Sequence, residues 1–155
     1  MRSSDVRFAM ITILKTLVRI DVAEHPKGSN RGEIVDRINI LEGGSLEDPW
    51  CASTYAFAYK LGHDLAGKPY GYEPSISTSE TVRRGKKAGK QTTAPKGGDA
   101  VCFMHADGSY FHTGCFNGWV NKQKGIYSVL EGNAGDRMQM RQHTTNEPAT
   151  FISCE

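Results

Sequence analysis

Cys51 lies near the start of a predicted helix, where a cysteine side chain is most easily ionised. Both ends of that helix are marked, by Asp48 as N-cap, Pro49 at the first helical position and Gly62 as a left-handed C-cap. Unpaired backbone N–H groups and the positive end of the helix dipole favour a thiolate in the first turn. Cys51 is therefore a candidate nucleophile.

A thiolate nucleophile needs a general base and a polar group that orients the base. On their predicted strand, His112 and Gly114 share one face, and Gly114 would leave room beside His112 for a substrate backbone. Glu131 ends the next strand, and Asn133 follows it after a glycine turn. Either side chain could accept the ring N–H of His112 and fix its tautomer. We favour Glu131, because an anion stabilises an imidazolium more strongly than an amide does. Asn133 would then polarise the site or contact substrate.

A zinc site is the alternative use of the same histidine. Cys102-x-x-His105 and His112-x-x-Cys115, here called the Cys/His pattern, have ligand spacing that is typical of zinc. Residues three apart on a strand point to opposite faces, so the four side chains would converge only if a tight turn released His105 from the pleat. We therefore predict no stoichiometric zinc. A nucleophile-elbow serine and P-loop spacing are both missing from the sequence.

The elements that must position these residues change in type along the chain. Four helical patterns come first. The first is capped by Ser3 or Ser4 and ends near Ala23, and the second covers 31–41 and is capped by Asn30 or Ser29. The third is the Cys51 helix, and the fourth starts at a capping box formed by Ser77 and Glu80. After a polar connection over 91–98, strand-like patterns cover 100–104, 111–116, 126–131 and 138–143, with Phe151-Ile152 as an edge. This order predicts a single α+β domain over 1–155.

The amino-acid composition limits the kinds of molecule that the protein is expected to bind. The formal net charge of the 155 residues is +2, which is too small to require a nucleic acid but would favour an anionic surface. A basic run holds Arg83, Arg84, Lys86 and Lys87. It is more typical of a solvated helix face than of a binding site, and its functional reading would be attraction to anionic wall polymers. The four cysteines are irregularly spaced and predicted to be reduced.

No segment of the sequence predicts a membrane span, and the best signal-peptide candidate is weak. The apolar stretch 8–14 follows Arg2 and Arg7, but it is short, Lys15 interrupts it, and no small-residue cleavage site follows. We predict a helix of the mature protein there. The chain would then be made in the cytoplasm without a signal peptide, and would depend on a holin, a virion or a secretion system for delivery.

Four blocks occur in an order that resembles a known family. Pro-Trp-Cys-Ala-Ser at 49–53, Gly-Asp-Ala-Val-Cys-Phe at 98–103, His-Thr-Gly at 112–114 and Glu-Gly-Asn at 131–133 are similar to the signature of CHAP-type (cysteine, histidine-dependent) amidohydrolase/peptidases. These are relatives of NlpC-type cell-wall peptidases. Residues 24–32 also resemble the segment before the cysteine helix in phage endolysin-like members, so the likeness spans about 24–141.

The resemblance implies a papain-like fold, with N-terminal helices packed on a C-terminal antiparallel sheet, in a monomeric peptidoglycan hydrolase. Cys51 would be the nucleophile and His112 the base, with Glu131 and Asn133 orienting the imidazole. The enzyme would be an amidase or an endopeptidase of a phage lysin or an interbacterial effector, and would act at the cell wall or in the periplasm after delivery. A different class remains open: a non-catalytic wall-binding or virion-structural module that has the same fold.

Two departures from the family pattern concern the surroundings of the cysteine. Papain-like enzymes often place a glutamine before the cysteine to help form the oxyanion hole, and none precedes Cys51 here. Some CHAP enzymes bind calcium through an acidic loop near the cysteine, for which Glu42, Glu47 and Asp48 are a sparse equivalent. No cofactor is required by this interpretation, and calcium is left as an alternative.

Overall fold

Four helices precede a six-stranded sheet in the computed structural model, which describes residues 5–155. The helices are α1 (Val6–Arg19), α2 (Glu33–Leu41), α3 (Cys51–Ala66) and α4 (Thr78–Lys87). The strands are β1 (Gln91–Thr92), β2 (Ala100–Met104), β3 (Tyr110–Asn121), β4 (Ile126–Glu131), β5 (Gln139–Thr144) and β6 (Ala149–Ile152). All neighbouring strands are antiparallel, in the order β1-β6-β2-β3-β4-β5. The predicted α+β class is confirmed.

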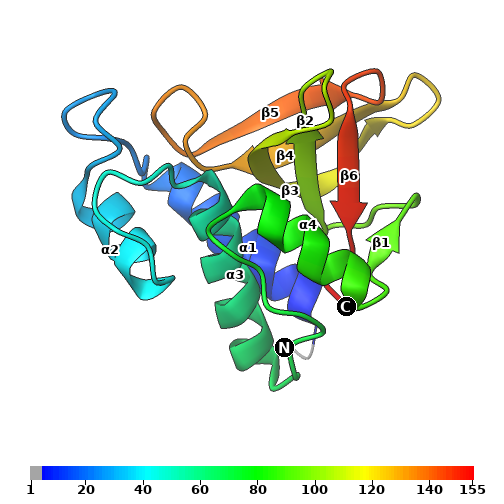
Figure 1. The fold of residues 1–155 in the computed structure, drawn as a ribbon, viewed down its shortest axis with the longest axis horizontal. Coiled ribbons are helices and arrows are strands. Elements are labelled where there is room, and N and C mark those ends of the chain that lie inside the picture. The colour runs from blue at the N-terminus through cyan, green and yellow to red at the C-terminus, as the bar shows by residue number, and fades with distance from the viewer. Residues whose placement is uncertain (1–4) are drawn as a thin grey trace.

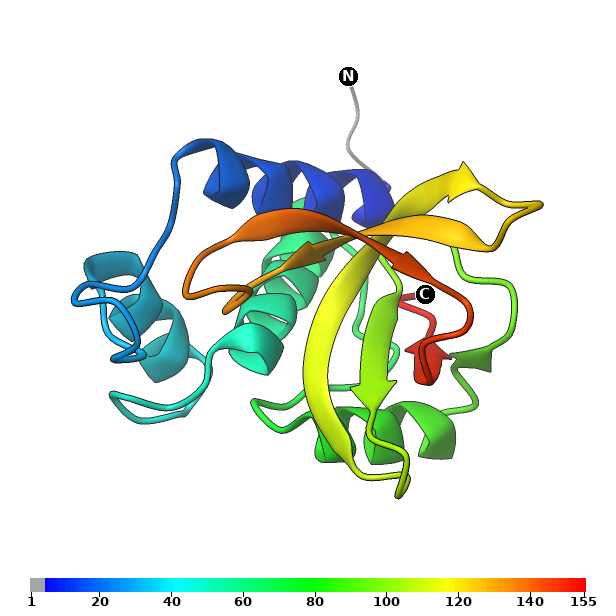
Figure 2. The ribbon, with the colours of Figure 1, turned by 90° about the horizontal axis from the view of Figure 1, so that it is seen from above.

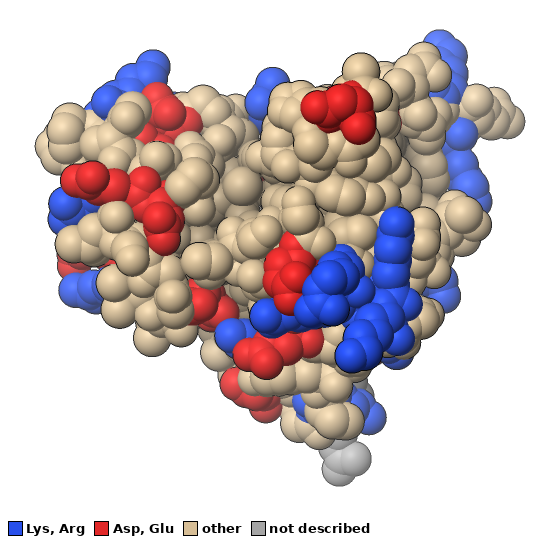
Figure 3. All heavy atoms as spheres, viewed as in Figure 1, with Lys and Arg blue, Asp and Glu red and all other residues tan. Residues whose placement is uncertain are grey.

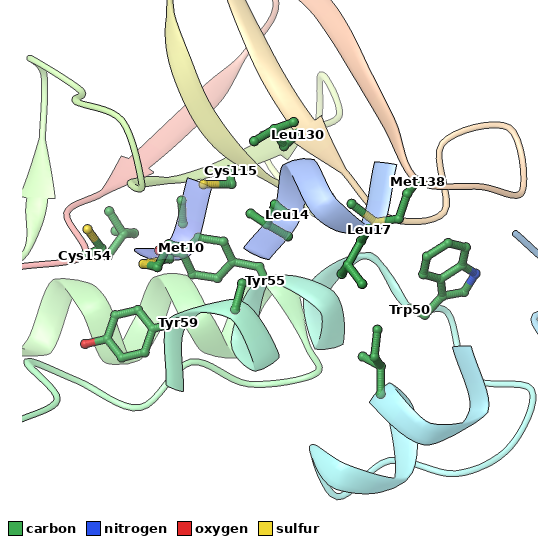
Figure 4. Packing of buried hydrophobic residues seen from close by; sticks show 14 of the residues in the cluster. Met10, Leu14, Leu17, Trp50, Tyr55, Tyr59, Cys115, Leu130, Met138 and Cys154 are labelled. Carbon is green, nitrogen blue, oxygen red and sulfur yellow. The ribbon is translucent and has the colours of Figure 1, made fainter. Parts of the chain in front are cut away.

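The helices α1, α3 and α4 lie against one face of the sheet, whereas α2 contacts α3 at one side of the molecule (Figures 1 and 2). Between helices and sheet lies the main core, where Met10 and Leu14 of α1 meet Tyr55 of α3 and Leu130 of β4 (Figure 4). A second apolar cluster lies on the other face of the sheet. Its buried members are Val101, Phe103, Phe116, Tyr127 and Val129.

The Cys51 helix begins at Cys51 itself, later than predicted. Trp50 occupies the N-cap position and makes no capping hydrogen bond with its side chain. Asp48, predicted as the cap, instead accepts the backbone N–H of Ser45 at 2.7 Å and closes a turn before the helix. The prediction of the N-cap was therefore wrong, although the helix exists and Cys51 lies in its first turn.

The same helix continues past Gly62 to Ala66, and Gly67 is its left-handed C-cap at φ 64°. Gly62 lies instead where α1 crosses α3. A Cβ at Gly62 would be 2.6 Å from Cγ of Met10, so a larger residue would push the two helices apart. The glycine thus serves helix packing, and its prediction as a helix end was wrong.

The starts of α1 and α4 follow ordinary capping chemistry. Asp5 caps α1 by accepting the N–H of Phe8 at 3.1 Å, while the predicted caps Ser3 and Ser4 lie outside the described residues. The helix ends at Arg19, short of the predicted residue 23. Ser77 caps α4 as predicted, by accepting the N–H of Glu80.

The start of α2 differs from the prediction. Gly32 is its N-cap and makes no side-chain hydrogen bond. Asn30 has a left-handed backbone, with φ 53°, and the side chain of Ser29 accepts the N–H of Arg31. Both predicted caps are therefore part of the preceding turn.

Strands β2 and β4 have the predicted bounds, but three other predictions about the sheet need correction. The connection predicted over 91–98 contains the short strand β1. Strand β6 is not an edge, because it pairs with both β1 and β2. In addition, β3 runs to Asn121, with register irregularities between Phe116 and Gly118 and between Trp119 and Asn121. Such bulges bend a strand, and β3 is visibly curved in Figure 2.

The apolar stretch at 8–14 is helical, as predicted, and lies within α1. Met10 and Leu14 are fully buried against α3 and the sheet. Within residues 5–155, no helix has both the length and the apolar character needed to cross a bilayer.

Candidate active site

The thiol of Cys51 lies at the buried start of α3, where the residue is 8 % exposed. Burial by itself would raise the pKa of this thiol. A hydrogen bond with the His112 ring, the charge of that ring, and the backbone N–H groups of Thr113 and Ala52 together bring the pKa below its ordinary value. The structure thus brings Cys51 and His112 together, and their contact favours the thiolate.

The ring of His112 bridges the thiol and a carboxylate. Its Nε2 lies 3.1 Å from Oε1 of Glu131, which leaves Nδ1 as the ring nitrogen available to Cys51. Burial lowers the pKa of His112, but the hydrogen bonds and charges of Cys51 and Glu131 raise it to about 9. The imidazole therefore holds its proton near neutral pH, beside a thiol whose pKa is lowered.

Glu131 is 1 % exposed and is stabilised as an anion by two histidines. Its Oε1 is 3.1 Å from Nε2 of His112 and 3.0 Å from Nε2 of His143. Burial would raise the pKa of Glu131, but these hydrogen bonds and the charges of the two rings lower it to about 2. The arrangement is thus a row of thiol, imidazole and carboxylate, in which Cys51 and Glu131 are buried and His112 is partly buried.

Two glycines determine how closely β3, β4 and α3 approach around this row. A Cβ on Gly132 would lie 2.6 Å from Oγ1 of Thr54, so the absence of a side chain lets the end of β4 approach α3. A Cβ on Gly114 would lie 3.0 Å from Cγ of Glu131. The same Cβ would come still closer to Cγ1 of Val129. Gly114 therefore makes room for Val129 and Glu131, and the prediction that it leaves space for substrate was wrong.

Asn133 is near the site but does not bind His112. Its backbone is left-handed, with φ 55°, and its amide donates to Oδ1 of Asn30 at 3.1 Å. Asn30 in turn donates its backbone N–H to Glu24, whose other carboxylate oxygen accepts the indole N–H of Trp50 at 2.9 Å. Of the two predicted partners, Glu131 is thus the one that contacts the imidazole. The buried Glu24 network was not predicted.

A cavity of about 270 Å³ lies beside His112, and Cys51 is not among the residues that line it. It combines aromatic, acidic and basic side chains: Phe103, Phe111, His112, Glu131, Asn133, Ala134, Gly135, Arg141, His143 and Glu147. The Nε of Arg141 is 3.9 Å from Oε2 of Glu131, and its side chain is half exposed. Asn133 therefore lines the space next to the reactive groups without belonging to the row itself.

His143, Arg141 and Glu147 were missed at the sequence level. Alternation along β5 puts Arg141 and His143 on one face, and pairing of Tyr127 with His143 shows that this is the Glu131 face of β4. The alternation was visible in the sequence, but the register that joins the two strands was not.

The Cys/His pattern does not assemble. Cys102 and Cys115 are buried in the core between sheet and helices, whereas His112 pairs with Phe103 on the opposite face. The ring of His105 stacks on Phe111 with centroids 4.2 Å apart. Among residues 5–155, no three His, Cys, Asp or Glu side chains are grouped as metal ligands.

The acidic residues considered for calcium have separate partners. Glu42 lies 2.8 Å from Nζ of Lys60, and Glu47 lies 3.9 Å from Arg31. Asp48 binds the backbone of the turn described above. These three carboxylates therefore do not form one ligand set.

The four cysteines are free, as predicted, and only one is suited to react. Burial raises the pKa of Cys102 and of Cys154 to about 12 and that of Cys115 well above its ordinary value. Cys51 is the single thiol whose pKa is lowered.

The basic run forms an exposed cluster over α4 (Figure 3). Arg83 and Arg84 both bind Glu80, at 2.6 and 2.8 Å, and so hold its pKa at about 2. Lys86 and Lys87 have no ion pair among the described residues. Two of the four cations thus share one carboxylate within the helix, as expected of a solvated face.

In the Cys51–His112–Glu131 row, His112 can take the proton of the Cys51 thiol and hold it for transfer. The residues come from the start of α3, the beginning of β3 and the end of β4. Comparisons of this chain with models of protein families, with curated proteins and with solved structures found no match.

Proposed function

We propose that this protein is a cysteine hydrolase that cleaves an amide bond of bacterial peptidoglycan. The observation that carries the proposal is that His112 lies between Cys51, whose pKa it lowers, and buried Glu131, which its Nε2 contacts at 3.1 Å. A thiol of lowered pKa beside a protonated imidazole is what nucleophilic catalysis on a carbonyl requires. The papain-like fold and CHAP-type membership belong to the same proposal, because they were expected from the four sequence blocks that contain these residues.

The reaction would proceed in two steps. The Cys51 thiolate attacks the amide carbonyl, and backbone N–H groups at the start of α3 stabilise the oxyanion. His112 then gives its proton to the leaving amine, which yields a thioester. In the second step His112 takes a proton from water as the water attacks the thioester, and the carbon–sulfur bond breaks to free the Cys51 thiolate beside the imidazolium. Glu131 keeps the ring oriented and stabilises its positive charge throughout.

Peptidoglycan is proposed as substrate on the resemblance together with the cavity. The space beside His112 has aromatic walls and the exposed guanidinium of Arg141, which suit a peptide bearing carboxylates. Lys86 and Lys87 would add a weak, salt-dependent attraction to anionic wall polymers. In this proposal the protein works as a monomer of a phage lysin or an interbacterial effector and reaches the wall or periplasm by delivery.

Incubation of the purified chain with purified sacculi tests the proposal. Release of new amino termini by the wild type, and none by Cys51→Ala, is the expected result. Mass spectrometry of the soluble muropeptides then distinguishes an amidase from an endopeptidase. Co-sedimentation with sacculi without any release would refute the enzyme and favour the non-catalytic wall-binding module.

A further inference from the structure

A second histidine binds Glu131 and is itself held between two carboxylates. His143 of β5 has a side chain that is 11 % exposed. Its Nε2 lies 3.0 Å from Oε1 of Glu131, and its Nδ1 lies 2.8 Å from Oε2 of Glu147. The other oxygen of Glu147 accepts the backbone N–H of Thr144 at 3.0 Å, which fixes this carboxylate in place.

These contacts determine the protonation of His143. An ionised carboxylate only accepts hydrogen bonds, and a neutral imidazole carries only one N–H. Both nitrogens of His143 face a carboxylate oxygen, so both must carry a proton and the ring is an imidazolium. Oε1 of Glu131 consequently accepts from two positively charged rings, those of His112 and His143.

The remaining groups around His143 support this assignment. The titratable and charged side chains that face it come from three strands and one turn: His112 of β3, Tyr127 and Glu131 of β4, Arg141 of β5, and Glu147 of the turn after β5. Burial would lower the pKa of His143, but its hydrogen bonds to Glu131 and Glu147 raise it. The ring of Phe103, with its centroid 4.5 Å away, packs on the imidazole and holds its orientation.

We propose that His143 is a positioning residue of the proposed hydrolase: as a permanent imidazolium it holds Glu131 against His112 and weakens the hold of Glu131 on the His112 proton. This inference rests on the proposed function. In the first step the Cys51 sulfur–carbon bond forms, the carbon–nitrogen bond breaks and the His112 proton moves to the amine. If Glu131 interacted with His112 alone, it would bind the His112 proton more strongly and make His112 a weaker acid for that transfer. Because Glu131 also interacts with His143, its interaction with His112 is weaker, and His143 itself gives up no proton.

The test is His143→Gln, which removes the charge and keeps an N–H donor for Glu131. NMR titration of the His112 ring protons should show its pKa rising by about one unit, because the positive ring that shares Oε1 of Glu131 with His112 is lost. The alkaline limit of the pH–activity profile should rise with it, and kcat should fall while KM stays unchanged. Glu147→Gln should act in the same direction, since His143 can then lose a proton.

His105→Gln is the matched control, because His105 is a histidine of the neighbouring turn that does not bind Glu131. It should leave the His112 titration unchanged. An unchanged His112 titration in both test variants, or a wild-type His143 that loses its proton near pH 6.5, would overturn the proposal. If His143→Gln fails to fold, Glu147→Gln decides, because that side chain is half exposed. A wild-type protein that releases nothing from sacculi would refute the hydrolase function but not the effect of His143 on His112, because the titrations need no turnover.

Discussion

Replacing Glu131 with glutamine should lower the proportion of Cys51 thiolate while leaving the shape of the site unchanged. Glutamine has nearly the same size, and its amide oxygen can still accept the N–H of His112. The substitution therefore removes the negative charge and little else. With less stabilisation of the imidazolium, the proton returns more often from His112 to the thiol.

The size of this effect follows from the His112 ring. Burial lowers its pKa, yet the contacts with Cys51 and Glu131 raise it from 6.5 to about 9. Such a rise corresponds to about 3 kcal/mol of stabilisation of the imidazolium. The contact with Cys51 contributes more to this rise than the contact with Glu131 does. A hydrogen bond to a charged group contributes roughly 1.5–3 kcal/mol, so we assign Glu131 the lower end of that range. Its loss should reduce the thiolate–imidazolium population about tenfold or more.

The rate of alkylation by iodoacetamide near neutral pH measures this population without any substrate. Cys51 should be the only residue modified, since the other three thiols are buried and have raised pKa values. In the wild type the pH dependence of the rate should change near pH 9, where His112 loses its proton. In Glu131→Gln the rate near neutral pH should be about tenfold lower, the change near pH 9 should move to lower pH, and only a trace of hydrolysis should remain.

Asn133→Ala is the matched control, since Asn133 follows the same strand but donates to Asn30 instead of binding His112. It should alter alkylation little and retain more activity than Glu131→Gln. Alkylation of Glu131→Gln at the wild-type rate would refute the reasoning that the charge of Glu131 keeps His112 protonated.

Four further outcomes are expected. Cys51→Ala and His112→Ala should each abolish release of amino termini while the circular dichroism spectrum is unchanged, because each removes a reacting group; turnover at the wild-type rate in either would disprove the site. Gly62→Ala should lower the free energy of unfolding in urea by about 1–3 kcal/mol, because the new Cβ would lie 2.6 Å from Cγ of Met10. Acid should remove the contribution of Glu131 to the free energy of unfolding, because the pKa of Glu131 falls from 4.5 to about 2 on folding. This contribution, about 3 kcal/mol, is complete above pH 4.5 and is lost as the pH falls through about 2, so Glu131→Gln should flatten the acid limb of a stability–pH curve. A zinc chelator should change neither activity nor Tm, and one equivalent of zinc whose removal unfolds the chain would overturn His112 as the base.

The sequence predicted those elements whose signals are local. The capping side chain of Ser77 and the alternation in β2 and β4 operate within a few residues, and these elements were found where expected. Gly62 failed as a helix end because its role depends on α1, which packs against it from elsewhere in the chain. Asp48 failed as a cap because the turn before the helix uses its carboxylate.

The same distinction between local and long-range signals applies to the residues of the site. Glu131 was preferred over Asn133 on charge alone, and it is the residue that contacts His112. His143 could not be found, because its approach to Glu131 depends on the register of β5 and on the curvature of the sheet. Nothing in the local sequence around 143 distinguishes it from a surface histidine.

The position of β6 has a consequence for synthesis. This strand is the last in the sequence, yet it separates β1 from β2 within the sheet. While the ribosome has not yet released residues 149–152, β2 lacks one of its two neighbours and exposes the backbone beside Val101 and Phe103. An unpaired apolar edge of this kind readily joins other chains. Nascent chains that stall before residue 149 should therefore depend on chaperones or be degraded, whatever the stability of the finished protein.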